Sequence, residues 1–418
     1  MEAIRPVSIS RAAWLVVALL FPVALLNYLD RQMLASMKGS VMQSIADIGS
    51  QQRWGFVLGL FKWVYALLSP IGGYLADRLG RKRVILFSLI AWSMVTWATG
   101  QATTYNELLV TRALMGISEA FYIPAALALI ADFHTGATRS RAVGVHQIGI
   151  YAGVIAGSFA GYLADSPELG WRWAFHACGV VGVLYALPLF GLLREAPRSV
   201  AMEVQTALSP GAAIKELWGS RNFVLLVLYF TLPAIAGWVV RDWMPAILRD
   251  ELGLAQGPAG VSAIVWWQSA AIVSAFFGGW LADRWMQRST RGRIGVSALG
   301  MVCLIPALVG IGLALTHQSL WWAVAFLVLY GIGWGLFDGN NMPILCQITR
   351  PELRATGYGV MNFVSISIGG FADLGFGAMR DQRVPLTIIF GLIAAAAAVS
   401  LVLVLLIRPQ EPVRPLNE

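Results

Sequence analysis

The sequence predicts an all-α polytopic membrane protein, with twelve transmembrane helices in two six-helix bundles. Composition is the first indication, because 58% of the 418 residues are hydrophobic, only 12% are charged, and the mean hydropathy is +0.68. A soluble domain is typically about 45–50% apolar and about 25% charged. The second indication is a series of twelve apolar segments, and the third is a loop motif that occurs in both halves of the chain.

Each apolar segment has the length of a transmembrane helix, since about 20 residues at a rise of 1.5 Å cross about 30 Å of hydrocarbon. Arg5 and Arg11 precede the first segment as they would in a signal peptide. That segment lacks a convincing small-residue cleavage site and many more follow it, so we expect a first transmembrane helix. The expected spans are residues 12–36, 54–76, 83–101, 107–131, 142–164, 174–193, 222–247, 261–283, 294–315, 320–348, 354–379 and 386–407.

Twelve spans place both termini on the same side of the membrane. Lys and Arg outnumber Asp and Glu by 30 to 22, a formal net charge of +8, and such residues gather in cytoplasmic loops. With the N-terminus inside, twenty of the 30 basic residues fall in cytoplasmic segments. We therefore expect cytoplasmic termini in a bacterial-type inner (plasma) membrane, and no nucleic-acid partner.

A repeated loop divides the chain into halves. The stretch GGYLADRLGRKR at 72–83 follows the second span, and GGWLADRWMQRS at 278–289 follows the eighth, so GG-x-LADR recurs 206 positions later. Parallel repeats of this kind occur in transporters whose substrate site lies between the halves near mid-membrane. We expect one bundle at 1–193, a cytoplasmic linker at 194–221 and a second bundle at 222–418.

Enzyme chemistry is not expected. The sequence has no Walker-type phosphate loop, no His/Cys metal cluster and no catalytic-triad spacing. The three cysteines, Cys178, Cys303 and Cys346, fall in apolar stretches, so a disulfide framework is not expected either. We expect no metal and no organic cofactor; energy would come from an ion gradient or from the substrate gradient.

The first span ends in LNYLDRQML at 26–34, where Asp30 and Arg31 interrupt an apolar run. A charge at the bilayer centre costs about 2.5–3.5 kcal/mol on insertion scales, so such residues usually have a function. Apolar residues continue to Met37, which favours a long, tilted helix with both charges inside the membrane. The alternative is that Asp30 lies close to the outer water.

The second span contains Lys62 and, one turn on, Tyr65. A cation and a phenol on nearly the same face would suit a carboxylate with hydroxyls beside it. The alternative is a lysine whose ammonium group reaches the outer surface while its stem stays apolar. Arg241 and Asp242, near the outer end of the seventh span, are expected to be an exposed or gate pair rather than a binding site.

The fourth span reads TRALMGISEAFYIPAA from residue 111. Arg112 and Glu119 are seven residues apart and so lie on one helical face, with Glu119 near mid-membrane. A simple structural pair that holds helices together is one interpretation. Ionisable groups at this depth usually mark an ion or substrate path, however. A buried carboxylate beside an arginine can bind and release a proton, so Glu119 is a candidate proton carrier.

Three further spans contain candidate binding residues. In the fifth, glycines at four-residue spacing predict close helix packing, and Gln147 near its start could reach the cavity; the glycines are Gly149, Gly153, Gly157 and Gly161. In the eighth, Gln268 follows Trp266 and Trp267, which with Trp334 could stack on a sugar ring.

The tenth span has Asn340 and Asn341 beside Asp338, where glycines and Pro343 interrupt the helix. A broken helix exposes backbone groups and is tolerated in a membrane where those groups line a cavity. Asn340 and Asn341 are therefore candidate substrate ligands, with helix distortion alone as the alternative.

The loop GG-x-LADR-x-GRK and the Arg-x-x-x-Gly of TRALMG resemble the signature sequences of the major facilitator superfamily, and the resemblance covers the whole chain. The second loop departs after Arg284, with Trp-Met-Gln-Arg in place of Gly-Arg-Lys. The resemblance implies a cytoplasmic latch in which Asp77 contacts Arg139 or Arg141 in the outward-open state. The gate residues that it implies are Gly73, Asp77, Arg78, Arg81, Arg139, Arg141, Asp283 and Arg284.

Within the superfamily, NYLDRQ and Arg-x6-Glu resemble the organic anion:proton symporters, which include hexuronate, galactonate and sialic acid carriers. This implies that Asp30 and Glu119 are the protonatable pair and Arg31 and Arg112 their partners. Spinster-like lysolipid transporters share the pattern. RATGYGVMNF at 354–363 and WMPAIL at 243–248 are closer to the anion symporters, and ADFHTGATRSRAVG at 131–144 is closer to Spinster.

The expected function is proton-coupled import of a small organic anion, most specifically a sugar acid, by a protein that is monomeric as superfamily members often are. The substrate-binding candidates are Arg31, Lys62, Tyr65, Arg112, Gln147, Gln268, Asn340 and Asn341. Protonation of Glu119 would weaken its hold on Arg112 and free that arginine for the substrate carboxylate. The alternatives are a Spinster-like carrier of lysophospholipid or another amphiphile, and a membrane sensor that binds a ligand without transport.

Overall fold

A computed structural model describes residues 11–134, 138–195 and 210–409. These residues form helices joined by short connections, so the prediction of an all-α membrane protein is confirmed. The chain separates into two compact units. The first contains Met1–Asp47 and Val64–Val200, and the second contains Ile48–Trp63 and Ala201–Glu418. The helix over 51–79 thus contributes its first half to the second unit and its second half to the first.

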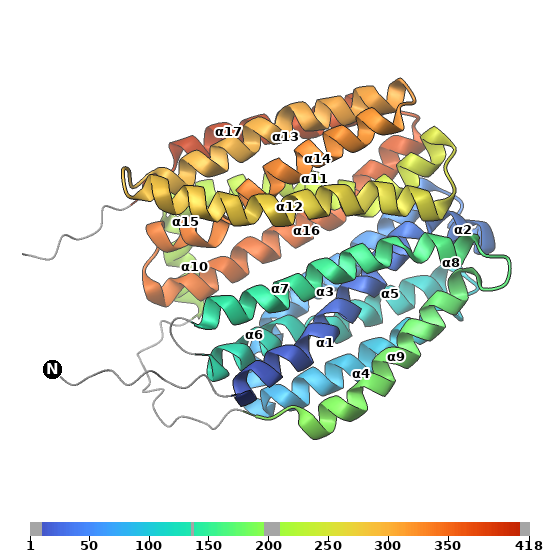
Figure 1. The fold of residues 1–418 in the computed structure, drawn as a ribbon, viewed down its shortest axis with the longest axis horizontal. Helices are drawn as coiled ribbons and strands as arrows, with labels where there is room; N and C mark the ends of the chain where they lie inside the picture. The colour runs from blue at the N-terminus through green and yellow to red at the C-terminus, as the bar shows by residue number, and fades with distance from the viewer. Residues whose placement is uncertain (1–10, 135–137, 196–209, 410–418) are drawn as a thin grey trace, which may run out of the picture. The chain divides into compact units, whose positions relative to one another are not determined.

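The first unit is a bundle of helices that pack side by side. In Figure 1, α1 runs beside α7, and α4 runs beside α9. The helices up to the linker are α1 (Arg11–Ser36), α2 (Lys38–Ser44), α3 (Gln51–Leu79), α4 (Arg81–Thr99), α5 (Tyr105–Glu119), α6 (Tyr122–Phe133), α7 (Arg139–Ser158), α8 (Ala160–Asp165) and α9 (Gly170–Leu192).

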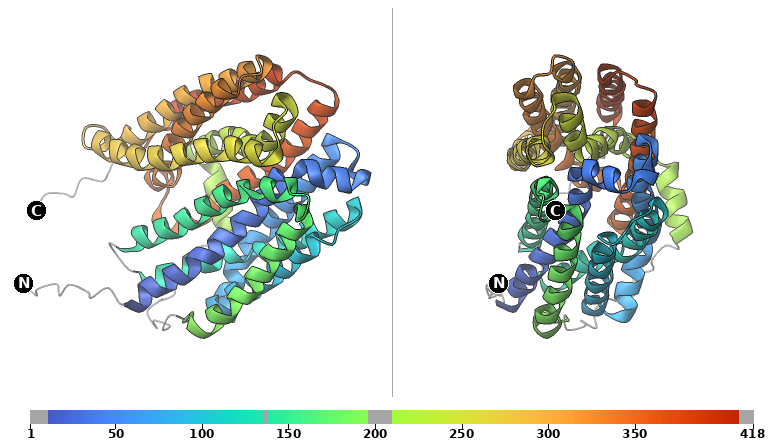
Figure 2. Two further views of the ribbon diagram at one scale, coloured as in Figure 1. Left: turned by 45° about the vertical axis from the view of Figure 1, so that its right-hand side comes forward. Right: turned by 90° about the vertical axis from the view of Figure 1, so that its right-hand side faces the viewer.

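The second unit packs α14 against both α12 and α13, and α11 against α16 and α17. Figure 2 shows these helices from two further directions. They are α10 (Pro210–Gly219), α11 (Arg221–Leu252), α12 (Gln256–Met286), α13 (Gly292–Thr316), α14 (Leu320–Asp338), α15 (Asn341–Ile348), α16 (Arg354–Asp381) and α17 (Leu386–Leu406). The ten-residue α10 lies inside the expected linker and is tied to the second unit by an ion pair of Glu216 with Arg350, at 2.6 Å.

Among the described residues, eleven helices or helix pairs are long and apolar enough to cross a membrane. They match the expected spans except the third, at 83–101. That segment is nevertheless helical, as the 19-residue α4. Its first turn contains Arg81, Lys82 and Arg83, which lower the mean hydropathy of so short a helix. The side on which the termini lie stays a prediction.

Three expected spans are broken helices. The fifth is interrupted at Phe159, between α7 and α8, which the sequence did not predict. The tenth is interrupted at Gly339 and Asn340, between α14 and α15, as the sequence predicts. Pro343 then falls in the first turn of α15, where a missing N–H costs nothing. The fourth span was expected to be continuous, but it breaks between α5 and α6, immediately after Glu119. A buried carboxylate therefore ends a helix in the middle of a span.

The glycine pattern of the fifth span has the predicted role, because α1 lies directly on it. A Cβ atom at Gly149 would be 2.9 Å from the carbonyl oxygen of Phe21, and one at Gly157 would be 2.6 Å from that of Leu29. Gly153 meets the backbone of Leu25 in the same way. This close contact with α7 fixes the part of α1 that ends in Asp30 and Arg31.

Glycines also set the two packing contacts of α3. In the second unit, a Cβ at Gly59 would be 2.8 Å from the carbonyl oxygen of Gly370 on α16, and the indole of Trp63 donates to the Ser367 carbonyl at 3.0 Å. In the first unit, a Cβ at Gly72 would be 2.9 Å from the Ala120 carbonyl oxygen, at the break between α5 and α6. Lys62 and Tyr65 are thereby positioned by different neighbours.

Candidate functional site

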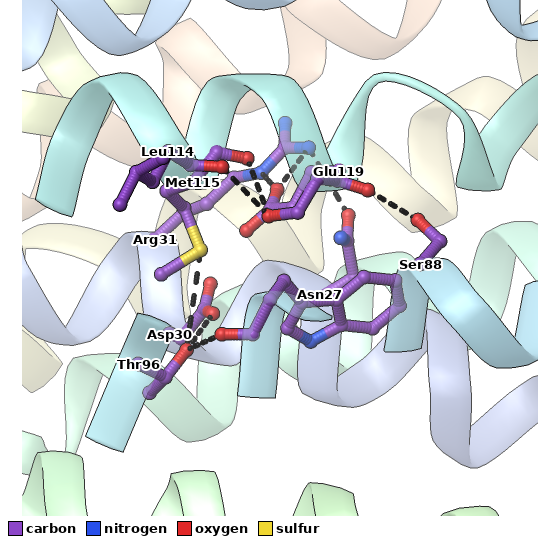
Figure 3. A network of polar contacts seen from close by, with 10 residues as sticks. Asn27, Asp30, Arg31, Ser88, Thr96, Leu114, Met115 and Glu119 are labelled. Atoms are coloured by element: carbon purple, nitrogen blue, oxygen red, sulfur yellow. Dashed lines mark hydrogen bonds and ion pairs between the residues drawn. The ribbon is translucent and has the colours of Figure 1, made fainter. Parts of the chain in front are cut away.

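Four charged residues, three of them buried and Arg31 half-buried, form a first charge cluster, defined as Asp30 and Arg31 of α1 and Arg112 and Glu119 of α5. Its shortest contact joins the Arg31 guanidinium to Glu119, with Nε donating to Oε2 at 2.6 Å and Nη2 at 2.5 Å from the same oxygen. Glu119 is fully buried, whereas the Arg31 side chain keeps 17% of its surface exposed. Figure 3 shows this contact with its surroundings. Arg31 is therefore the member of the pair that a ligand could reach.

Arg31 is held on several sides. Its Nη2 donates to Oδ1 of Asn27, one helical turn earlier on α1, at 3.1 Å. Its Cζ lies 4.7 Å from the ring centroid of Tyr28 and 4.8 Å from that of Tyr65, distances at which a guanidinium is attracted to an aromatic face. Tyr65 comes from the half of α3 that belongs to the first unit, and its contact with Arg31 was not predicted from the sequence.

Asp30 lies on α1 next to α4 and is buried. Its Oδ2 accepts a hydrogen bond from Thr96 Oγ1 at 2.8 Å. Within the described part of the chain, Oδ1 of Asp30 and Oε1 of Glu119 have no hydrogen-bond partner. Buried polar atoms are normally paired, so each of these two oxygens is a place where a proton could bind. The alternative that Asp30 lies in outer water does not agree with its burial.

Arg112 does not form the expected contact with Glu119. Its Nη2 donates to Thr99 Oγ1 of α4 at 3.0 Å, and the side chain is buried. Seven residues of helix separate Arg112 from Glu119 by about 10 Å along the axis, so the two share a face without meeting. The partner of Glu119 is instead the guanidinium of Arg31, which comes from α1. The predicted set of charges is present, but its expected pairing is wrong.

A second charge cluster lies in the second unit and consists of Lys62, Asp242 and Asp373. Lys62 Nζ is 2.5 Å from Asp242 Oδ2 and also binds Asp373 Oδ2. Trp243 Nε1 donates to the other oxygen of Asp373 at 3.2 Å, and the Trp238 ring centroid is 4.2 Å from Nζ. All three charged residues are buried, since Lys62 and Asp373 are almost fully covered and Asp242 is 8% exposed.

This cluster excludes the alternative interpretation of Lys62 and corrects the expectation for Asp242. Lys62 does not extend to a surface, because its ammonium group is enclosed by two carboxylates and an indole. Asp242 is not an exposed residue, because it begins the buried run of α11 that continues to Leu248. Asp373 was not identified at all. It is an acidic residue within the span 354–379, so the rule that singled out Glu119 would have found it.

The other predicted ligands lie on several helices. Gln268 of α12 is buried, and its Oε1 has no hydrogen-bond partner among the described residues. Asn340 uses Nδ2 to bind the Leu336 carbonyl at 2.9 Å, which closes the end of α14, and Asn341 beside it is also buried. Gln147 is half-buried on α7. Among the described residues, none of these four forms a hydrogen bond or ion pair with the charge cluster of its own unit.

An aromatic group accompanies Gln268 in the second unit. The rings of Trp267, Tyr330 and Trp334 lie with centroids 5.6 to 6.4 Å apart. Trp266, also a stacking candidate, is 51% exposed and lies outside this group. Tyr330 and Trp334 are stacked, whereas Trp267 meets both of them edge to face, and the role of this aromatic group stays a prediction.

The loop residues differ in what the structure describes. The surroundings of Gly73 and the side chain of Asp77 lie outside the described part of the structure, so the latch of Asp77 with Arg139 or Arg141 stays a prediction. Arg139 donates to the His134 carbonyl at 3.1 Å, and Arg141 is exposed.

Two other loop contacts are defined. Arg81 binds Asp132 and the Ala128 carbonyl of α6, and Asp283 binds Arg293 at 2.9 Å. The first contact joins α4 to α6 in the first unit, and the second joins α12 to α13 in the second unit. The remaining arginines lie over rings of their own helices, Arg78 over Tyr74 and Arg284 over Trp280.

Comparison with known proteins gives one family. The model of the Major Facilitator Superfamily matches residues 20–372. Human Protein spinster homolog 1 is 33% identical over 269 residues, which are 62% of this chain and 50% of that protein. Probable anion transporter 1, chloroplastic, of Oryza sativa is 31% identical over 298 residues, 66% of this chain and 54% of that protein. The chain thus spans about half the length of these two relatives.

The similarity to an MFS-type efflux pump of Mycolicibacterium smegmatis covers more of both chains, with 28% identity over 89% of this chain and 85% of that one. Two solved structures have the same fold at a TM-score of 0.77. One is a bacterial homolog of the human lysosomal transporter Spinster, inward-facing and unoccupied, with 22% identity and 95% coverage of both chains. The other is a D-xylose-proton symporter, with 16% identity over 95% of this chain and 98% of that one.

Proposed function

Because the chain belongs to the Major Facilitator Superfamily, with a family match over residues 20–372, we propose that it is a proton-coupled symporter. It imports a small organic anion, namely a sugar acid of the hexuronate, aldonate or sialic acid type, by alternating access. The superfamily consists of transporters rather than enzymes. The observation that supports this proposal best is the buried pair of Arg31 and Glu119.

Charge balance explains how this pair couples a proton to an anion. With every group ionised, the first charge cluster contains two carboxylates and two guanidinium groups, so it is neutral. A proton on Glu119 gives the cluster one positive charge and removes the carboxylate that holds Arg31. A net charge away from water is costly, and an anion at Arg31 restores neutrality. Each ligand therefore strengthens the binding of the other, as linkage requires.

Arg31, rather than Arg112, is the anion ligand in this mechanism. Its side chain is partly exposed, and the planar donors of its guanidinium suit a carboxylate. The phenols of Tyr28 and Tyr65 lie beside it, where they can bind hydroxyl groups of the substrate. Arg112 is buried and already donates to Thr99, so it acts as a fixed counter-charge.

Further parts of the proposal concern the rest of the transport cycle. Asp30 is the second protonatable group of the cluster. Gln147, Gln268, Asn340 and Asn341 contribute polar contacts to the substrate, and Asp77 latches the cytoplasmic side. The protein functions as a monomer in a bacterial-type inner membrane, with its termini in the cytoplasm.

Proteoliposomes with a pH-sensitive dye inside provide the test. Hexuronates, aldonates, sialic acid and a lysophospholipid are added in turn, and internal acidification is recorded. We expect acidification with a sugar acid, and its loss in Glu119→Gln. The matched control is Asp250→Asn, which removes a partly exposed carboxylate paired with Arg249 and should transport as the wild type does. Proton-driven uptake that survives in Glu119→Gln would contradict the mechanism.

A second candidate is a Spinster-like carrier of lysophospholipid or another amphiphile. It is favoured by the 33% identity to human Protein spinster homolog 1 and by the fold shared with its bacterial homolog. In the same assay, a response to the lysophospholipid and silence with every sugar acid would select this candidate. Binding of a ligand without any flux would select a sensor.

A further inference from the structure

The second charge cluster is unbalanced where the first is not. Lys62 supplies one positive charge to two carboxylates, Asp242 and Asp373, and both accept from the same nitrogen. Acceptors of one ammonium group are at most about 5–6 Å apart, so the two carboxylates lie close together. Like charges at this separation in a buried site oppose each other's ionisation. A fully ionised cluster would keep one uncompensated negative charge.

The neighbouring charges do not remove this imbalance. Arg241 precedes Asp242 on α11, and adjacent residues of a helix do not face each other. Its Cζ is 5.3 Å from the Trp238 ring, the same ring that Lys62 approaches. The next charged groups of α11 and α16 bind elsewhere. Asp250 pairs with Arg249, Glu251 with Arg380, and Asp381 accepts from the backbone N–H groups of Gln51 and Gln52.

A metal ion does not fit the same place. The described residues contain no group of three or more His, Cys, Asp or Glu side chains that could hold one. The position between the carboxylates, where a cation would bind, is occupied by Lys62 Nζ. A proton needs no such space, because it binds to one carboxylate oxygen.

We propose that Asp242 and Asp373 hold one proton between them and form a second proton-binding site, located in the second unit. With that proton the cluster is neutral, consisting of one ammonium, one carboxylate and one carboxylic acid. The proton belongs to the pair rather than to either residue. Trp243, which donates to Asp373, and Lys62, which donates to both, keep the two side chains oriented when the proton leaves.

Infrared spectroscopy of the full chain in lipid, without any substrate, tests this site. The carbonyl stretch of a protonated carboxyl group is identified by its shift in D2O. Measurements are made at neutral pH in the Glu119→Gln background, so that this carboxyl does not contribute. We expect Asp242→Asn and Asp373→Asn each to remove the signal of one protonated carboxyl. Each leaves a balanced pair of Lys62 and one aspartate. Asp250→Asn on the same helix α11 should leave the signal unchanged.

A Lys62→Met variant should change the protonated-carboxyl signal in the opposite direction. Without the ammonium group, both carboxylates must be neutralised, and the protonated-carboxyl signal should increase by one group. The proposal is overturned if the signal is the same in wild type, Asp242→Asn and Asp373→Asn while these variants elute and melt like the wild type. An unchanged signal in a folded Lys62→Met protein would overturn it as well. Since no substrate is involved, failure of the transport assay does not affect this result.

Discussion

At the scale of single residues, Arg31 is the group on which the proposed transport depends. It combines a buried carboxylate partner with a partly exposed side chain. Lysine keeps the charge but cannot bind a carboxylate with two parallel donors. We expect Arg31→Lys to raise the substrate concentration for half-maximal uptake by about tenfold, which corresponds to ~1.4 kcal/mol.

Concentration-dependent uptake into proteoliposomes measures this effect. Arg249→Lys is the matched control, because Arg249 forms a partly exposed pair with Asp250, and it should behave as the wild type. Equal half-maximal concentrations for Arg31→Lys and the control would show that the substrate does not bind this guanidinium.

Thr96 connects Asp30 to α4, and its hydroxyl is the donor to a fully buried carboxylate oxygen. A Thr96→Val substitution keeps the shape and removes the donor. An unsatisfied buried group costs about 1–3 kcal/mol, so we expect a lower melting temperature in detergent. The control is Thr316→Val, whose hydroxyl binds only its own helix at Gly312 in the structure. Similar melting temperatures for the two variants would mean that Asp30 finds another donor.

The residue types of the first charge cluster could be predicted from the sequence, because a charge in an apolar span is conspicuous. Their pairing could not be predicted, since Arg112 on the same helix and Arg31 on another helix were both possible partners of Glu119. Only the tertiary arrangement, in which the Arg31 side chain of α1 reaches Glu119 of α5, decides this. The exposure of Asp242 was predicted wrongly for a related reason. Its exposure depends on α3 and α16, which are distant in sequence but enclose it through Lys62 and Asp373.

At the scale of elements, close helix contacts hold the first charge cluster in place. Gly153 of α7 meets the backbone of Leu25 on α1, five residues before Asp30. We expect Gly153→Leu to destabilise the protein by about 1–3 kcal/mol or more, because the two backbones must separate. Proton-coupled uptake should be lost as well, since the cluster moves with α1.

Gly144 provides the control on the same helix, because nothing lies within 4 Å of a Cβ atom there. Gly144→Leu should change stability by less than about 0.5 kcal/mol. Thermal unfolding and uptake are measured for both variants. A Gly153→Leu protein as stable and active as Gly144→Leu would contradict the close approach of α1 and α7.

Most elements could be predicted from hydropathy and length alone, and the spans agree with α1 to α17 within a few residues at most ends. The break after Glu119 was missed although Pro124 lies in the first turn of α6, just as Pro343 lies in the first turn of α15. The interruption of the tenth span was predicted because Gly339 and Pro343 mark it. A proline in the first turn of the second helix thus accompanies both of these breaks, so the same residue type could have predicted both.

At the scale of the whole molecule, the two charge clusters together predict how transport responds to membrane potential. In the proposed mechanism, the first cluster carries one proton together with one monovalent anion, which moves no net charge. If the second cluster also releases and rebinds its proton in each cycle, two protons accompany one anion, and one positive charge enters. An interior-negative potential should then drive uptake by the wild type even without a pH gradient.

The Asp373→Asn variant separates the two contributions. It leaves Lys62 balanced by Asp242, so the second cluster has no proton to exchange, while the first cluster is intact. We expect its uptake to follow the pH gradient but to lose its response to potential. Uptake is measured in proteoliposomes with an imposed potassium diffusion potential, with Asp250→Asn as the control that keeps both responses. If Asp373→Asn responds to potential as strongly as the wild type, the proton of the second cluster stays in place throughout the cycle, and its role is to neutralise a buried carboxylate rather than to drive transport.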